Sequence, residues 1–370
     1  MKEKNVLNIR FLYNVNGLVF NVGDKGSKER KNQRFQKSFG YASADNVKHC
    51  LVEKFSELTG TSRPKKYFIK DRTKSEKDKQ GEIYTDFDLT NSYICLFGHW
   101  NPTDITLQKG KYAKCSLKSI IDIADMIPLH PLLVSMEKNV GVNNGSSNDQ
   151  VVFKIKENVF CYSVEDLMKK GKETKEDAER LFRETRPMNF INKNNTSSGI
   201  YYLDFHINLN NIRYVDISDV TLSDEEKKRY EKENGYEFIT DTRSGRNYCK
   251  IPEDQAISRF KALVEALFTW DFMSNNATHG SRKERLRTTI SLNNTDKWQQ
   301  ATLAYTNDDQ TSASLELLPK EVEEALGIYS YNTKLLRTVY CDKDIECSID
   351  ADDKAMKKII ELGCDVISNI

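Results

Sequence analysis

The chain has 370 residues, of which 38% are hydrophobic and 30% are charged, and its formal net charge at pH 7 is only +1. That length allows one large domain with insertions or two modest ones, and the apolar share allows a real core. No stretch approaches the roughly 20 apolar residues that a membrane-spanning helix needs, and the polar N-terminus lacks the apolar segment of an export signal. The sequence therefore predicts a cytoplasmic protein that does not associate with membranes.

The eight cysteines are scattered, mostly inside apolar segments. None forms a Cys-x-x-Cys pair, and none stands at zinc-ribbon spacing with a histidine. The chain also lacks a dinucleotide fingerprint and the Gly-x4-Gly-Lys-Ser/Thr motif of a P-loop. We therefore expect reduced, packed thiols, no metal and no cofactor.

The first 60 residues predict a strand, a basic loop and a helix. Val6–Phe20 is rich in β-branched and aromatic residues, which indicates one long strand or two strands joined at Asn16-Gly17. A polar loop, Asn21–Ser38, follows. Ser43 is then placed as the N-cap of a helix whose apolar residues recur at helical spacing and which ends near Thr59-Gly60.

The middle of the chain alternates structured segments with long polar insertions. The insertions are a lysine-rich linker at Thr61–Gln80, a mobile loop rich in Asn, Gly and Ser at Asn139–Asp149 and a flexible polar excursion at Arg186–Gly199. The expected structured segments are Ile83–Trp100, the apolar Lys114–Val134, strands at Val151–Tyr162, Tyr201–Leu209 and Arg213–Asp216, and helices at Ser163–Lys170, Lys172–Arg183 and Ser223–Glu233, the last capped by Ser223.

The last third begins with the clearest amphipathic helix, Asp254–Phe272, which leads into a second basic loop, Ser274–Thr288. The remaining expected elements are strands at Thr288–Leu292, Gln300–Tyr305 and Leu335–Tyr340 and helices at Pro319–Leu326 and Asp353–Leu362. No internal repeat is present. The pattern predicts an α+β fold.

Positive charge is concentrated in two places although the total is near zero. The first region carries seven cations against three acids, namely Lys25, Lys28, Arg30, Lys31, Arg34, Lys37 and Lys48 against Asp24, Glu29 and Asp45. The second carries four against one, namely Arg282, Lys283, Arg285 and Arg287 against Glu284. Local clusters of this kind are typical of a groove that binds a polyanion.

The first cluster combines cations with two features that bring a backbone close to phosphates. Gly23 and Gly26 allow backbone amides to approach an anion. The start of the predicted helix adds a hydroxyl at Ser43 and cations at Lys48 and His49, at a helix end whose unpaired amides favour anions. The alternatives are an exposed charged hairpin loop followed by an ordinary capped helix with a surface lysine.

The second cluster is held between two elements that we expect to be buried. His279, Ser281, Arg282, Lys283 and Arg285 follow the amphipathic helix and precede a strand. Arginines can bind phosphates through two hydrogen bonds, so these residues are candidate nucleic-acid contacts. The alternative is a solvated charged face.

Enzyme signatures are weaker. The five histidines are far apart and share no motif with an acid or a nucleophile. Asp24 and Asp45 are two of the four carboxylates inside the basic segments, and either could polarise a ribose hydroxyl or help to hold a metal. A structural role at a loop or helix cap is the alternative.

Several short motifs resemble one protein family. They are Gly-Leu-Val-Phe-Asn-Val-Gly-Asp-Lys-Gly at 17–26, Tyr-Ala-Ser-Ala-Asp-Asn-Val-Lys-His at 41–49, Leu-Phe-Gly at 96–98 and Ala-Thr-His-Gly-Ser-Arg at 277–282. In this order the chain resembles the CRISPR-associated Cascade backbone family, the Cas-seven group of RAMP proteins, nearest to its DevR-like branch. The resemblance spans roughly residues 5–100 and 150–305.

The resemblance implies an RRM-like (ferredoxin-like) palm, formed by residues 1–60 and 151–305, with an inserted finger and thumb region at 61–150 and a completion of the palm at 306–370. The thumb hairpin could lie in Arg186–Gly199 or in Pro128–Asp149. The residues that would hold the RNA backbone by this resemblance are Lys25, Lys28, Ser43, Lys48, His279, Ser281 and Arg282. Two features depart from the family pattern: the 28–37 loop is more basic than it requires, and His49 stands where a second basic residue is common.

We therefore expect a CRISPR effector backbone subunit without catalytic activity. It would polymerise along crRNA as a helical filament, bind the sugar-phosphate backbone without sequence specificity and present guide bases to a target nucleic acid, alongside other effector subunits. One alternative is a backbone subunit that cleaves target RNA through a loop aspartate, with Asp24 as the candidate and Asp45 behind it. The other is an unrelated α+β interaction protein whose basic loops bind an acidic protein.

Overall fold

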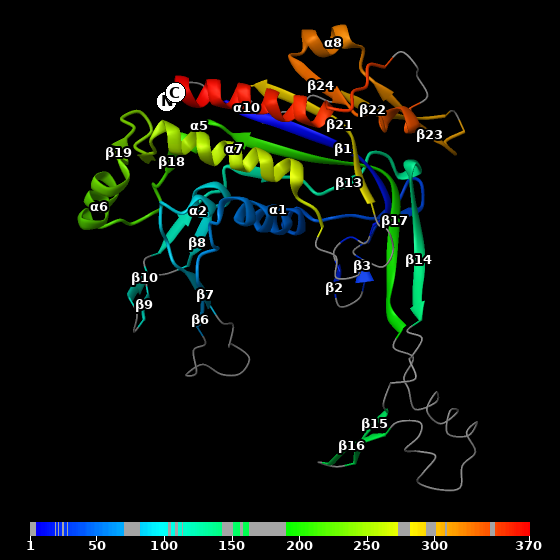
Figure 1. Cartoon of the computed structure of the whole chain (residues 1–370), viewed down its shortest axis with the longest axis horizontal. Helices are drawn as coiled ribbons and strands as arrows, with labels where there is room; N and C mark the ends of the chain where they lie inside the picture. Colours follow the sequence, from blue (N-terminus) through cyan, green and yellow to red (C-terminus); the bar gives the residue numbers. More distant parts are fainter. Residues whose placement is uncertain are drawn as a thin grey trace.

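A seven-stranded antiparallel sheet forms the centre of the computed structural model (Figure 1). Its main path runs β12-β17-β1-β21-β24, and two further strands pair with β17 beyond β12. These strands are β1 (Val6–Leu18), β12 (Ile121–Ile123), β13 (Ile127–Pro128), β14 (Val134–Val142), β17 (Phe190–Asn208), β21 (Arg282–Asn293) and β24 (Ile328–Asn332).

The structure describes residues 5–18, 20, 22–23, 26–27, 29–69, 82–102, 105–107, 110–112, 114–142, 151–155, 158–162, 190–272, 282–293, 301–307, 309–340 and 345–370. No helix in these ranges is long and apolar enough to cross a lipid bilayer.

Three helices, α1 (Ala44–Thr59), α7 (Glu253–Thr269) and α10 (Ala351–Asn369), cover one face of the sheet (Figure 1). Along the chain, the four central strands and two of these helices follow in the order β1, α1, β12, β17, α7 and β21. Alternate residues of β1 point to this face, where Leu7, Ile9 and Phe11 are fully buried among the helices. Each such burial contributes about 1.5–3 kcal/mol, so the strand and the helices stabilise one another.

Between α7 and α10 the approach is close because α10 carries a glycine. A Cβ at Gly363 would overlap the ring of Phe260 on α7. The absence of a side chain at Gly363 therefore lets the Phe260 ring contact the backbone of α10.

The opposite face of the sheet carries buried polar side chains. Arg10 on β1 donates two hydrogen bonds to Asp204 on β17, at 2.7 and 2.6 Å, and its guanidinium lies 4.3 Å from the centre of the Tyr202 ring. On β21, Arg287 pairs with Glu323. Both arginines are buried, so each charge is compensated where water cannot reach it.

A second, smaller core lies beside the sheet. Its elements are α2 (Ser92–Phe97), β8 (His99–Asn101), β11 (Cys115–Leu117), β18 (Tyr214–Asp216), α6 (Asp224–Asn234), β19 (Glu237–Thr240) and β20 (Asn247–Lys250). Arg259 on α7 joins it to the main core by donating to the carbonyls of Leu89 and Thr90 and to the Tyr236 hydroxyl.

Several two-stranded ribbons extend from these cores, and most of them project to the same side of the sheet (Figure 1). One group contains β6 (Lys66–Ile69) with β7 (Glu82–Thr85) and β9 (Ile105–Leu107) with β10 (Gly110–Tyr112). A longer ribbon is formed where β14 pairs with the first half of β17. The other short elements are β2 (Val22–Gly23), β3 (Gly26–Ser27), β4 (Glu29–Asn32), β5 (Lys37–Gly40), η2 (Pro131–Leu133), β15 (Val151–Ile155), β16 (Asn158–Tyr162), α5 (Asn210–Arg213), β22 (Thr302–Thr306), β23 (Ala313–Leu317), α8 (Lys320–Ala325) and α9 (Leu336–Val339).

The structure confirms the strongly periodic predictions. The first strand is a single strand, and the helices predicted from Ser43, Ser223 and Asp254 are all present. At α6 the Ser223 hydroxyl accepts from the Glu226 amide, and the Glu226 carboxylate accepts from the Ser223 amide, as a capping box requires.

Other predictions were wrong. The segment 190–199, predicted to be a flexible excursion, is the first half of β17, and it pairs with β14, so the two candidate thumb segments are partners in one ribbon. The segment predicted as a strand at 335–340 contains helix α9, strand β24 was missed, and 151–162 is two paired strands. The helices predicted at 163–183 lie outside the described residues.

Gly199 marks the point where the long ribbon leaves the sheet, and it allows a test of this geometry. Its φ is +138°, and a Cβ would lie 2.7 Å from the Val134 Cα and still nearer the Leu133 carbonyl. We expect Gly199→Ala to lower the free energy of unfolding by about 3 kcal/mol, because neither backbone atom can move away cheaply. Urea denaturation measures the change.

The matched control is Gly245→Ala. Gly245 also has a positive φ, +68°, but nothing lies within 4 Å of its Cβ position. Its loss is expected to be about 1 kcal/mol, from backbone strain alone. Equal losses at the two positions would contradict the close packing at the base of the ribbon.

Candidate nucleic-acid interface

The two basic segments leave the sheet at the same end. Antiparallel pairing sets Asn16, near the end of β1, opposite Arg282, the first residue of β21. The chain that follows β1 and the chain that precedes β21 therefore start from neighbouring points. The predicted contacts Asp24, Lys25, Lys28, His279 and Ser281 belong to these segments and lie outside the described residues.

The described end of the sheet offers a cation beside two hydrogen-bonding side chains. The Arg282 side chain is 75% exposed, and its guanidinium lies 4.0 Å from the Glu284 carboxylate. On the other side of β1, the Ser198 hydroxyl accepts from the Gly17 amide and donates to Asn16 Oδ1, at 3.4 Å. A phosphate at this edge could take its charge partner from Arg282 and its hydrogen bonds from the neighbouring strands.

Beside this edge stands the β4–β5 hairpin, whose base is fixed to β17. The Gly40 amide donates to the Ser197 hydroxyl at 3.2 Å, and the Tyr201 hydroxyl donates to the Gly40 carbonyl at 3.0 Å. The hairpin carries four exposed cations, Arg30, Lys31, Arg34 and Lys37. Its basic surface is thus held next to the end of the sheet.

Arg34 also connects the hairpin tip to a distant turn. It donates to Gln310 Oε1 at 3.3 Å, and the ring of its neighbour Phe35 packs edge-on against His130. Burial and the charge of Arg34 both lower the pKa of His130.

The start of α1 differs from the sequence prediction. Ser43 occupies the N-cap position, but its side chain makes no capping hydrogen bond. Instead Asp125 accepts from the Ala44 amide at 2.8 Å and pairs with Arg30 at 2.6 Å, while Arg30 stacks 4.1 Å from the centre of the Tyr41 ring. The anion favoured at this helix end is therefore supplied by the protein itself.

Lys48 and His49 are also engaged within the protein. The Lys48 ammonium donates to the Phe97 carbonyl at 2.8 Å, at the C-terminal end of α2, and burial lowers its pKa. His49 is exposed and lies 3.1 Å from the Arg63 guanidinium. Lys48 satisfies a carbonyl that the end of α2 would otherwise leave without a partner. A contact of either residue with RNA stays a prediction.

The second basic segment is a strand from Arg282 onward, and strand geometry divides its cations. Arg282 and Glu284 point outward, whereas Lys283 and Arg285 point to the helix-covered face. The side chains of Lys283 and Arg285 are 7% and 9% exposed. In this conformation neither offers its charge to a phosphate, which corrects their placement on an open loop.

Lys283 is enclosed by aromatic rings. Its ammonium lies 3.3 Å from the centre of the Trp270 ring, and 5.3 and 5.4 Å from those of Tyr13 and Phe272. It donates to the Trp270 carbonyl at 3.0 Å and lies 3.6 Å from the Asp271 carboxylate. Burial lowers the pKa of Lys283 to about 7, against the opposing effect of Asp271.

Arg285, two residues further along the strand, also binds the end of α7. It donates to the Phe268 carbonyl at 3.1 Å, pairs with Asp352 at 2.7 Å and stacks on the rings of Phe11 and Phe268. Lys283 and Arg285 thus bind carbonyls at the C-terminal end of α7, where a helix favours cations.

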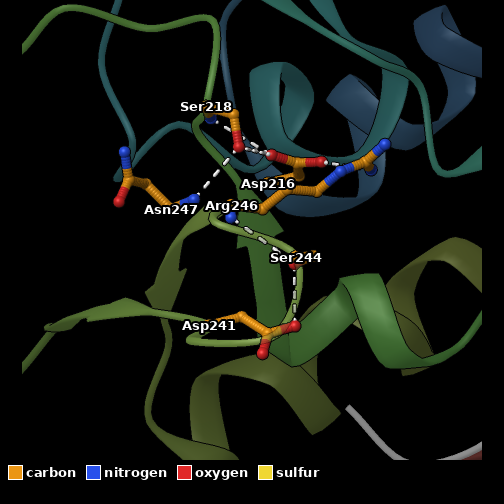
Figure 2. Close-up of polar contacts among 6 residues, drawn as sticks. All are labelled: Asp216, Ser218, Asp241, Ser244, Arg246 and Asn247. Carbon is orange, nitrogen blue, oxygen red and sulfur yellow. Dashed lines mark hydrogen bonds and ion pairs between the residues drawn. The ribbon is translucent and has the colours of Figure 1, made fainter.

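A further basic turn, between β19 and β20, lies at the far end of the molecule and was not singled out in the sequence (Figure 1). Figure 2 shows how it is held: Arg246 pairs with Asp216 at 3.1 Å, and Ser244 donates to Asp241 at 2.8 Å. Arg243 in the same turn is exposed. Among the described residues, no group of three or more His, Cys, Asp or Glu side chains could hold a metal ion.

Comparisons with known proteins give structural similarity only. No family model matches the sequence, and no curated protein matches it. Among solved structures, the fold is similar to a chain of a "CRISPR RNA-guided surveillance complex, pre-nicking", with a TM-score of 0.44 and 8% identity over 97% of this chain and 100% of that chain. A chain of a "CRISPR RNA-guided surveillance complex" gives 0.42 and 10% over 95% and 99%. At these values the similarity does not assign a function.

The capping of α1 can be tested with two substitutions. Asp125→Ala should lower the free energy of unfolding by about 1–2 kcal/mol, because the Ala44 amide loses its acceptor. Ser43→Ala should change it by less than about 0.5 kcal/mol, since the Ser43 side chain makes no capping bond. Urea denaturation of both variants decides which side chain caps the helix, and a larger loss for Ser43→Ala would contradict the structure.

Lys283 predicts a pH dependence of stability. Its pKa is about 7 in the folded protein and close to its ordinary value of 10.5 in the unfolded chain. Between these values the unfolded state binds more protons, so this residue makes the free energy of unfolding rise with pH, by up to about 1.4 kcal/mol per pH unit. Lys283→Met should lack this contribution. Urea denaturation of both proteins from pH 6 to pH 9 measures the difference, and parallel curves would contradict it.

Proposed function

We propose that this chain is a backbone subunit of a CRISPR effector complex that binds crRNA through its sugar-phosphate backbone. The observation that carries the proposal is the pairing of Asn16 with Arg282, which brings the two basic segments of the sequence to one end of the sheet. The exposed cations of the β4–β5 hairpin stand beside the same end. A single strand of nucleic acid lying across that end would meet both groups.

The order of the elements supports an RRM-like palm. The chain order β1-α1-β12-β17-α7-β21 and the sheet order β12-β17-β1-β21 match the split βαβ arrangement of ferredoxin-like folds. On this interpretation the β14–β17 ribbon is the thumb and the ribbons around β6–β11 are the fingers. Both project from the same side of the palm (Figure 1).

The chemistry of the exposed groups favours binding without sequence specificity. Lysine and arginine side chains contact phosphates, which carry no base information, and they set the register of the strand. A subunit of this kind leaves the base edges free to pair with a target. We propose that copies assemble side by side along the guide, with other effector subunits in the cytoplasm.

The proposed role is that of a scaffold and not of a nuclease. Incubation of the assembled complex with labelled target RNA and Mg²⁺ tests this. We expect intact RNA, whereas regularly spaced products that disappear in Asp24→Ala would establish the cleaving alternative.

Nucleic-acid binding is tested with Lys31→Ala/Arg282→Ala, which removes one exposed cation from each segment. We expect the Kd for single-stranded RNA to rise about tenfold or more, and the slope of log Kd against log salt to fall by about 1.4, since each lost phosphate contact on a single strand removes about 0.7. Fluorescence anisotropy at several salt concentrations measures both quantities.

The matched control is Arg243→Ala, which removes an exposed cation from the distant β19–β20 turn. Its binding should equal that of the wild type. Equal losses for the two variants, or purified protein that carries no RNA by its absorbance ratio at 260 and 280 nm, would contradict the proposed interface and favour an acidic protein as the partner.

A further inference from the structure

Lys283 lies next to the one cation of its strand whose side chain is mostly exposed. It follows Arg282 directly, and the alternation of the strand sends the two side chains in opposite directions. Its ammonium is held by groups from two other elements, namely Tyr13 on β1 and Trp270 and Asp271 just after α7. Lys283 therefore links the start of β21 to β1 and to the end of α7.

We propose that Lys283 is a positioning residue for nucleic-acid binding: its side chain, held between Trp270 and Asp271, fixes the start of β21 so that Arg282 faces the bound strand. The inference rests on the proposed function and deepens it. It adds a residue that does not touch the ligand and whose enclosed position nevertheless sets the affinity.

Capping of α7 does not by itself explain a lysine at this position. Arg285 already provides a permanent cation to the end of that helix, through the Phe268 carbonyl, and it has its own acid in Asp352. Lys283 instead binds the residues that follow the helix. It thereby ties the end of α7 to the start of β21, which are the two described ends of the second basic segment.

Burial and the groups that face Lys283 make its charge depend on pH near neutrality. They are Asp271, which favours the ammonium, Arg285, which disfavours it, and the buried Cys50 on α1 and Tyr13 on β1. Burial raises the pKa of Tyr13, so this hydroxyl stays neutral near pH 7. Loss of the Lys283 proton removes both the ion pair with Asp271 and the attraction to the Trp270 ring. Burial nevertheless outweighs both, because the pKa of about 7 in the enclosed position lies below the ordinary value of 10.5. Loss of the proton therefore favours the enclosed position, and the link between α7 and β21 should tighten as the pH rises through about 7.

A substitution at Asp271 tests the inference, because simple electrostatics and the proposed role of Lys283 predict opposite changes in the affinity for RNA. Its side chain is 75% exposed, so Asp271→Asn leaves the core intact and removes a negative charge near the proposed interface. Simple electrostatics predicts tighter binding of RNA, whereas loss of the tie predicts weaker binding. We expect the Kd for a fluorescein-labelled single-stranded RNA to rise about fivefold.

The matched control is Glu284→Gln, which removes the acid nearest Arg282 on the same strand. It should bind RNA as tightly as the wild type or more tightly. Tighter binding by both variants would overturn the inference and leave the proposed function standing, because it would show that only charge near the interface matters.

A second measurement varies the charge of Lys283 itself. Between about pH 6 and pH 8.5 the wild-type Kd should fall about fivefold beyond any change seen in Lys283→Arg, whose side chain keeps its charge. Lys283→Met should bind weakly at both pH values. If Lys283→Met fails to fold by circular dichroism, the comparison of wild type with Lys283→Arg still decides. Identical pH profiles would overturn the inference, and a wild type that binds no RNA would overturn the proposed function with it.

Discussion

The pairing of β1 on both edges is the constraint on which the rest of the structure depends. This strand contacts β17 on one side and β21 on the other over nearly its whole length, and its side chains are buried on both faces. A slip of one residue would turn Leu7, Ile9 and Phe11 away from the helices and move Arg10 from Asp204. The register is therefore fixed by packing and by charge together. The same register sets Arg282 beside Asn16, so the candidate interface is a consequence of how the core is assembled.

Cations in this protein fall into two groups with different physical roles. Arg10, Arg287, Lys283 and Arg285 are buried and bound to carboxylates or helix carbonyls, where removing one partner would leave an uncompensated charge. The cations of the β4–β5 hairpin and Arg282 are exposed to solvent. Partial desolvation of an exposed cation against a phosphate costs little free energy, and the release of counterions from the nucleic acid favours the contact. A count of local charge does not separate these groups, because it ignores which way each side chain points.

The sequence alone predicted the elements whose formation depends on neighbouring residues in the chain. Periodic apolar residues predicted β1, α1 and α7, and Ser223 with Glu226 predicted the cap of α6. It failed where a distant segment decides the outcome. The polar residues 190–199 form a strand because β14 pairs with them, and Asp125 replaces the Ser43 side chain at α1 because β12 and β13 bring it there. For Lys283 and Arg285 alternation alone would have failed. Counted back from the core residues Ile290 and Leu292, it turns both side chains away from the helices, and the register shift between β1 and β21 at Leu12/Tyr13 turns them toward the helices.

Two helix termini beside the first basic segment are already satisfied from within the protein. Asp125 occupies the N-terminal end of α1, and Lys48 occupies the C-terminal end of α2. A polyanion would therefore gain little from the dipole of α1, the C-terminal end of α2 would repel it, and in the proposed interface it is held by side chains on strands. Cations fixed to a sheet keep a constant spacing, and a phosphate backbone repeats at a constant spacing whatever its bases. Binding through the end of a sheet is thus suited to a strand of any sequence, provided that the few residues that orient those cations, Lys283 foremost, hold them rigidly.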